Sequence, residues 1–189
     1  MSTLTVQNLR GVSPTNLITV ASGHKMYAPG GVVQVQQTVK TDTWSASPST
    51  GSFSEVTGFS VSITPTKTTS KILVMVNAYL GCYNYQIKGL VKRNGTTIAV
   101  GDAAGTRPRV SFNLNAYAGS ASNDSYHLLP TAFTYLDSPS STSTCTYTVE
   151  LSCYGGNWVG FNRSYTWQEN ANDYEGLPVS TITVMEIAQ

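Results

Sequence analysis

The sequence predicts an all-β protein: a single antiparallel β-sandwich, jelly-roll-like in its strand pattern, with an extended N-terminal arm. Apolar and polar residues alternate along many short segments, which is typical of strands with one buried face. Stretches rich in Gly, Pro, Ser and Asn separate these segments, and eight or nine strands at such spacing form a sandwich or jelly roll. No window places apolar residues at helical spacing between a capping box and a glycine stop, so we expect little or no helix.

The first 31 residues are predicted to form an arm ahead of the folded domain. They contain Pro14 and the pair Pro29-Gly30, and no alternating segment begins before Val32. We therefore divide the chain into an arm, 1–31, and a β-sandwich domain, 32–189. The start has no basic stretch followed by an apolar run, and no apolar run is long enough to span a bilayer, so we expect neither classical secretion nor membrane insertion. The arm residues expected to anchor it to a partner are Leu4, Val6, Leu9, Leu17, Ile18 and Val20.

Two strands and one hairpin are the clearest elements. The odd-numbered residues from Cys145 to Cys153 are apolar and the even-numbered residues between them are polar. Phe59 to Ile63 alternates in the same way, and Pro65 then ends that strand because it has no N–H to donate. Asn94-Gly95 predicts a tight hairpin, since both central positions of such a turn need positive φ. The breaks between strands are expected at Trp44–Ser52, Thr64–Ser70, Gly101–Arg107, Gly119–Ser125, Asp137–Thr144 and Gly155–Pro178.

The segments Lys71–Leu80 and Val179–Ile187 differ, because large apolar residues occur on both faces of each predicted strand. A sandwich gives a strand only one core face. The second face is therefore covered either by a long loop or by another subunit, and we favour a subunit interface. The residues expected in that interface are Leu73, Met75, Tyr79, Met185 and Ile187.

Charge and cysteine usage exclude several classes of partner. Charged residues make up 11% of the chain, and eleven Lys and Arg against ten Asp and Glu give a net charge of +1 without any block of one sign. We therefore expect no nucleic-acid partner and no anionic membrane partner. Cys82, Cys145 and Cys153 are odd in number and have no CxxC spacing. This argues against disulfides and zinc, and we expect reduced thiols packed in the core.

The chemistry of an enzyme is not apparent in the sequence. His24 and His127 are the only histidines, and neither has a spacing typical of metal ligands. No GxSxG nucleophile elbow is present among the many serines. Acidic residues that could form a pair for glycan cleavage occur, but nothing repeats at the period of a solenoid. We expect no catalytic residues, no metal and no cofactor.

Aromatic residues are concentrated between Tyr154 and Tyr174, interleaved with glycines and asparagines. Aromatic faces beside amides suit sugar rings, whose C–H faces pack on rings while the amides bind hydroxyls. The alternative, which we weight more, is that these rings fill the core or a seam between subunits. The residues considered for glycan or receptor contact are Trp158, Phe161, Tyr165, Trp167 and Tyr174.

Several short motifs occur in an order that is similar to a known family. They are Tyr27–Val35, Phe59–Pro65, Ser70–Val74, Leu136–Pro139, Thr146–Val149 and Ile182–Ile187. Together they resemble the short tail-fibre and fibre-like virion proteins of cyanophages. The resemblance implies a jelly-roll head that forms a homotrimer, an anchoring N-terminus bound to other proteins of the tail, capsid or portal region, and a distal face that contacts a host surface glycan. It also implies a protein of the virion, assembled in the host bacterial cytoplasm.

One departure from the family keeps two alternatives open. Many relatives carry this head on a long shaft, whereas only 31 residues precede the head here. A short arm with a trimeric head also suits a capsid decoration (cement) protein, whose arm lies along the shell and pairs with it. A third possibility, from another class, is a soluble glycan-binding lectin unrelated to virions.

Overall fold

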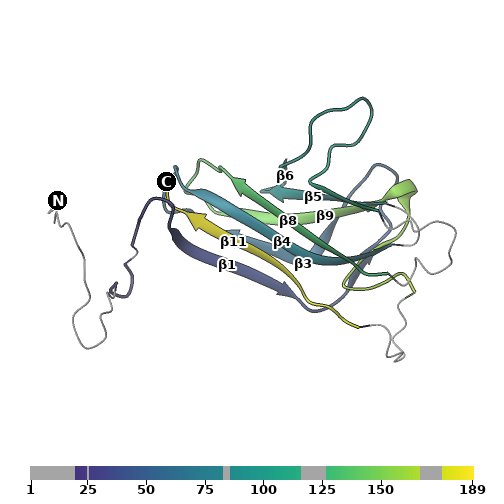
Figure 1. The fold of residues 1–189 in the computed structure, drawn as a ribbon, viewed down its shortest axis with the longest axis horizontal. Helices are drawn as coiled ribbons and strands as arrows, with labels where there is room; N and C mark the ends of the chain where they lie inside the picture. The colour runs from purple at the N-terminus through teal and green to yellow at the C-terminus, as the bar shows by residue number, and fades with distance from the viewer. Residues whose placement is uncertain (1–19, 25, 83–85, 116–126, 167–175) are drawn as a thin grey trace.

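A computed structural model describes residues 20–24, 26–82, 86–115, 127–166 and 176–189. In these ranges the chain forms antiparallel strands packed as two facing sheets, so the predicted all-β sandwich is confirmed (Figure 1). The one helix within them is a short 3-10 turn, η2 (Tyr154–Gly156). The strands are β1 (Val32–Lys40), β2 (Trp44–Ala46), β3 (Ser54–Ile63), β4 (Lys71–Cys82), β5 (Gln86–Arg93), β6 (Thr96–Ile98), β7 (Phe112–Asn115), β8 (Leu129–Asp137), β9 (Cys145–Cys153), β10 (Val159–Phe161) and β11 (Ser180–Ile187).

The strand order is that of a jelly roll. The first sheet has the order β1-β11-β4-β8, and the pair β10 and β2 extends it along the end of β4. The second sheet has the order β3-β9-β5, with β7 and β6 both paired to the far side of β5. Most successive long strands alternate between the sheets, which is how a jelly roll is wound. The two sheets thereby present two separate outer faces.

The core lies between the sheets and is built from the alternating positions. All odd-numbered residues of β9 are buried, as are the even-numbered residues of β4 from Ile72 to Leu80. Phe59 of β3 and Phe161 of β10 are fully buried and their ring centroids are 4.6 Å apart. Close packing of this kind contributes most of the stability of a sandwich of this size.

The hairpin and the strand end predicted from local sequence are also confirmed. Asn94 and Gly95 have φ of 49° and 79°, and they join β5 to β6. The Asn94 side chain also accepts a hydrogen bond from the N–H of Thr146 at 2.8 Å, which attaches the hairpin to β9. β3 ends at Ile63, two residues before Pro65.

Two of the predicted breaks contain strands. Trp44–Ala46 forms β2 inside the expected break at Trp44–Ser52, and Val159–Phe161 forms β10 inside Gly155–Pro178. Both strands have three residues, and a segment that short cannot display an alternation. They form because they pair with each other and because β10 pairs with the end of β4. The expected break at Gly119–Ser125 lies outside the described residues.

Candidate functional site

The outer face of the first sheet carries a row of apolar side chains that crosses four strands. In the strand register Val35 of β1 lies opposite Met185 of β11, Met185 opposite Leu73 of β4, and Leu73 opposite Leu136 of β8. We call these four residues the apolar row. Val35 and Leu136 are 49% and 43% exposed, and Leu73 and Met185 are partly exposed between them. Side chains opposite one another in antiparallel strands are in contact range, so the row is continuous.

The five residues predicted for a subunit interface all lie on this one face. Leu73 and Met185 belong to the apolar row, Met75 and Ile187 are the next outward residues beside it, and Tyr79 lies farther along β4. None of the five is fully buried within the chain, because the core occupies the other face of β4 and β11. That a second subunit covers these five residues stays a prediction. Reasoning from sequence missed Val35 and Leu136, since their membership depends on which strands neighbour β4 and β11.

A shallow hollow lies on the same face, beside Tyr79. Its volume is about 210 Å³. Tyr79, which lies at the edge of this hollow, is 37% exposed. The hollow is lined by Asn77, Ala78, Tyr79, Pro130, Thr131 and Ala132.

The outer face of the second sheet is polar by comparison. Ser62 of β3 and Thr146 of β9 share a hydrogen bond of 2.8 Å, and Lys92 of β5 forms an ion pair with Glu150 of β9. Cross-strand polar pairs of this kind satisfy one another at a wet surface. The sandwich therefore has one outer face that is apolar along a row and another that is polar.

The aromatic segment is divided by the structure. The structure corrects the prediction that Phe161 contacts a glycan or receptor. Its side chain is fully buried against Phe59 in the core, so it cannot make that contact. Trp158 and Tyr165 form an edge-to-face pair with centroids 5.3 Å apart, and the guanidinium of Arg163 lies 5.3 Å from the Trp158 ring. Tyr165 is 41% exposed, so this pair can be reached from solvent. Trp167 and Tyr174 lie outside the described residues.

Two buried carboxylates occur in the same row across the inner face of the first sheet. Glu186 of β11 and Asp137 of β8 lie on either side of Ile72 of β4. Both are nearly inaccessible to solvent, at 0% and 4% exposure. A buried carboxylate is tolerated only with several donors, so the surroundings of each one show what it does.

Glu186 ties the loop between β3 and β4 to the sheet. Its carboxylate accepts hydrogen bonds from the N–H of Thr66 at 2.8 Å, from the hydroxyl of Ser70 at 2.7 Å and from the amide of Gln34 at 2.6 Å. The hydroxyl of Thr66 donates as well. Both carboxylate oxygens thus accept hydrogen bonds from the protein itself. We conclude that Glu186 has a structural role and closes one end of the sandwich.

Protonation of Glu186 is expected to destabilise the protein in acid. Burial raises the pKa of this carboxyl, but the hydrogen bonds from Thr66, Ser70 and Gln34 outweigh burial, and the pKa lies below its ordinary value of 4.5. A depressed pKa contributes stability above the unfolded-state pKa, and this contribution is lost as pH falls through the folded-state pKa. Urea midpoints should therefore be flat from neutral pH to about pH 5 and fall below about pH 4.5.

The variant Glu186→Gln isolates that effect. It should cost about 1–2 kcal/mol at neutral pH, because the amide nitrogen cannot accept from the same donors. Its stability should also fall less steeply than that of the wild type below about pH 4.5. Asp102→Asn, an exposed carboxyl, serves as the control. An equally steep decline in Glu186→Gln would assign the acid sensitivity to other groups.

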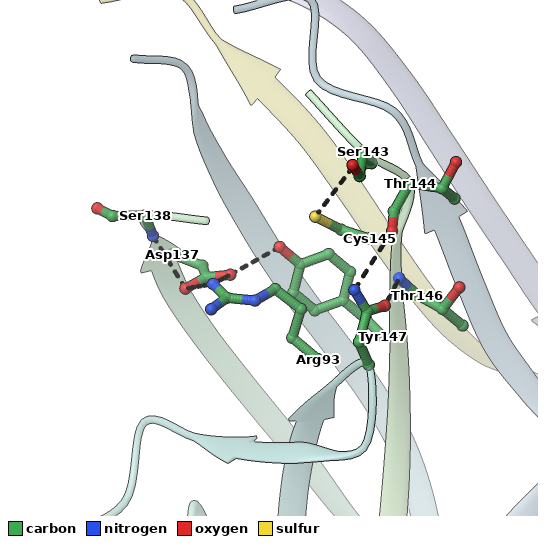
Figure 2. Close-up of polar contacts among 9 residues, drawn as sticks. Arg93, Asp137, Ser138, Ser143, Thr144, Cys145, Thr146 and Tyr147 are labelled. Carbon is green, nitrogen blue, oxygen red and sulfur yellow. Dashed lines mark hydrogen bonds and ion pairs between the residues drawn. The ribbon is translucent and has the colours of Figure 1, made fainter. Parts of the chain in front are cut away.

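Asp137 joins the two sheets (Figure 2). Arg93 Nη1, from β5, donates to both carboxylate oxygens at 2.7 and 2.6 Å, and the Tyr147 hydroxyl, from β9, donates at 2.7 Å. The N–H of Ser138 donates to the same group at 2.9 Å. Burial, and then the hydrogen bond from the Tyr147 hydroxyl to Asp137, raise the pKa of Tyr147 far above its ordinary value. The arrangement is a structural link between sheets, a role that the sequence did not predict for Asp137.

The three cysteines are buried free thiols, as expected. Burial raises the pKa of Cys145. A hydrogen bond with Cys82, and then burial, raise that of Cys153. Thiols in this state are poor nucleophiles. His24 and His127 are exposed. Within the described ranges no three His, Cys, Asp or Glu residues are grouped as metal ligands.

The described part of the predicted arm begins at Val20, which is 42% exposed. The other proposed anchoring residues, from Leu4 to Ile18, lie outside the described residues. Closer to the domain the chain docks on the sandwich: Gly30 N–H donates to the carbonyl of Ala188 at 2.8 Å, and the Tyr27 hydroxyl donates to the carbonyl of Gln189 at 3.2 Å. The Nζ atom of Lys67 lies 3.5 Å from the centroid of the Tyr27 ring. Residues 27–31 thus pack on the domain rather than extending from it, and β1 begins at Val32.

Comparison with known proteins gives little. No protein-family model matches the chain, and no curated protein matches it. No helix in the described ranges is long and apolar enough to cross a membrane. Among solved structures the chain is similar to one titled "Crystal structure of infectious bursal disease virus VP2 subviral particle", with a TM-score of 0.37 and 10% sequence identity. The match covers 92% of this chain and 42% of that chain, so the present chain spans less than half the length of that protein.

Proposed function

We propose that the protein is a non-enzymatic structural component of a phage particle, which assembles with copies of itself through the outer face of the first sheet. The apolar row supports this proposal most directly. Soluble monomers rarely leave a continuous apolar strip uncovered across a whole sheet, and such strips mark interaction surfaces. The polar outer face of the second sheet provides the contrast within the same molecule.

A second copy is the partner that this face suits best. Among the described residues no ion pair lies on this face, whereas Lys92 and Glu150 pair on the second sheet. Obligate interfaces between identical subunits are depleted of charge and rich in Met, Leu and aromatic residues. With only 11% charged residues the chain has little to keep such a face solvated. The proposed assembly is a trimer, following the family that the sequence resembles.

More specifically, we propose that the protein is a short tail fibre or head fibre that contacts the host. The alternative is a capsid decoration protein. In both, the arm attaches the trimer to the particle. A truncated protein beginning at Tyr27 tests this, because it keeps the contacts of Tyr27 and Gly30 with the domain. It should fold and assemble with its own copies but no longer join particles. A free lectin would keep all of its activity after the same truncation.

Introducing charge into the apolar row should dissociate the assembly. Leu73→Lys or Met185→Lys would bury one unpaired ammonium per subunit, which costs about 3 kcal/mol and weakens association about a hundredfold. Sedimentation velocity at micromolar concentration should show a trimer for the wild type and a monomer for each variant. The matched control is Thr57→Lys, an exposed residue of β3 in the second sheet.

Two outcomes of that experiment would refute assembly through this face. One is a wild type that sediments as a monomer at every accessible concentration. The other is a trimer that survives both lysine variants, which would place the interface elsewhere. Circular dichroism of each variant excludes unfolding as the cause of dissociation, since these side chains lie outside the core.

A further inference from the structure

A second hollow lies on the opposite side of the molecule, over β5 and β7 of the second sheet. The connection from β6 to β7 projects from the sheet (Figure 1). Its residues Arg107, Pro108 and Val110 line one side of the hollow. The volume is about 440 Å³, which falls within the usual size of small-ligand sites. The lining residues are Gln86, Lys88, Arg107, Pro108, Val110 and Asn113.

The base of that connection is fixed by hydrogen bonds. The N–H of Gly101 donates to the carbonyl of Val110 at 3.3 Å, and Arg109 Nε donates to the carbonyl of Gly101 at 2.6 Å. Ser111 donates its N–H to Gly89 of β5 at 2.9 Å and its hydroxyl to the carbonyl of Ile98 at 3.1 Å. These bonds hold both ends of the loop against the sheet. The ends of the connection that carries Arg107 and Pro108 are therefore held in place before any ligand binds, which lowers the entropic cost of binding.

Two cations and no acidic residue are found among the described residues that line the hollow. The ion pairs among the described residues are Lys40–Asp42, Lys92–Glu150 and Arg93–Asp137, so neither Lys88 nor Arg107 takes part in one. Lys92, four residues along β5 on the same face as Lys88, is by contrast neutralised by Glu150. In a chain with so few charges, two unneutralised cations at one hollow favour an anion there.

We infer that this hollow binds a carboxylate-bearing saccharide. The guanidinium of Arg107 matches a carboxylate in a bidentate geometry, and Lys88 adds a second charge-assisted hydrogen bond. Gln86 and Asn113 supply donors and acceptors for ring hydroxyls. Pro108 and Val110 provide an apolar wall for the C–H face of a sugar ring, and Tyr154, 55% exposed, has its ring centroid 5.9 Å from Lys88 Nζ.

A sugar acid fits this lining better than an inorganic anion. Phosphate sites are usually built from backbone N–H groups that converge on the anion, whereas this hollow presents side chains and an apolar wall. The site also lies on the face that assembly through the first sheet would leave exposed. The inference does not depend on the proposed assembly, and the two can fail separately.

Calorimetric titration of the full chain with trigalacturonic acid at low ionic strength tests the inference. We expect millimolar or tighter binding, and a loss of at least about tenfold in affinity for both Arg107→Gln and Lys88→Gln. Lys92→Gln removes the same charge from the same face of β5 and should bind like the wild type. Trigalacturonic acid methyl ester, which carries no charge, should bind much more weakly than the acid.

The inference is overturned by any of three results. These are no heat of binding to the wild type, equal affinity for the methyl ester, or unchanged affinity in both pocket variants. Displacement of the saccharide by equimolar sodium phosphate would also overturn it, by showing a general anion site. Sedimentation of the same variants should match that of the wild type, so that a failure of assembly is not mistaken for a failure of binding.

Discussion

Replacing Asp137 with alanine is expected to lower the free energy of unfolding by about 3 kcal/mol. The carboxylate is buried and accepts from Arg93, Tyr147 and the backbone of Ser138. Without it the partly exposed guanidinium of Arg93 loses its ion-pair partner, and the hydroxyl of the buried Tyr147 loses its acceptor. Breaking a buried ion pair by removing one partner is costly for this reason, even where the intact pair contributes little net stability.

Denaturant unfolding measures this effect, with Asp102→Asn as the exposed control. A paired replacement, Arg93→Met with Asp137→Leu, separates the two parts of the cost. Because it removes both charges together, it should recover much of the stability lost in Asp137→Ala. If Asp137→Ala unfolds within about 0.5 kcal/mol of the wild type, the network is not a link between the sheets.

The parts of the fold that follow from local pattern could be predicted from the sequence. The odd-numbered residues of β9 point into the core because strand geometry alternates side chains, and this needs no knowledge of neighbouring strands. The Asn94-Gly95 hairpin is equally local, since it depends on two residues that adopt positive φ. The predicted interface residues were found in the same way, as apolar side chains left on the second face of β4 and β11.

What could not be predicted depends on strand order and register. Val35 and Leu136 join Leu73 and Met185 in one row only because β1 and β8 are the outer strands beside β11 and β4. Strand alternation places Glu186 on the inner face with Ile182 and Val184, but its charge gives no local sign that the position is covered. It is buried because its register places it at the end of the core, under the loop that carries Thr66.

The aromatic segment shows the same limit at a single residue. Phe161 and Tyr165 are four residues apart and look alike in sequence, yet the first is fully buried and the second is 41% exposed. The difference arises from β10, whose pairing with Leu80 of β4 directs Phe161 into the core. Amino-acid composition therefore identified an aromatic-rich segment but could not predict which of its rings are exposed.

Replacing Phe161 with alanine should lower the free energy of unfolding by about 3–5 kcal/mol. The ring is fully buried and packs on Phe59 at 4.6 Å between centroids, so its removal loses both the apolar transfer energy and the contacts around the cavity that remains. Phe161→Leu keeps much of the volume and should cost considerably less. Urea unfolding of the two variants measures the difference.

Tyr165→Ala is the matched comparison, because it removes an aromatic ring of similar size from the same segment. Its ring is partly exposed and contacts Trp158 edge to face, so we expect a loss of about 1 kcal/mol or less. A Phe161→Ala variant that unfolds like Tyr165→Ala would contradict the burial of Phe161 and restore it as a surface residue. A large gap between the two would instead exclude Phe161 from any ligand contact in this segment, because a ring that fills the core cannot also bind a sugar.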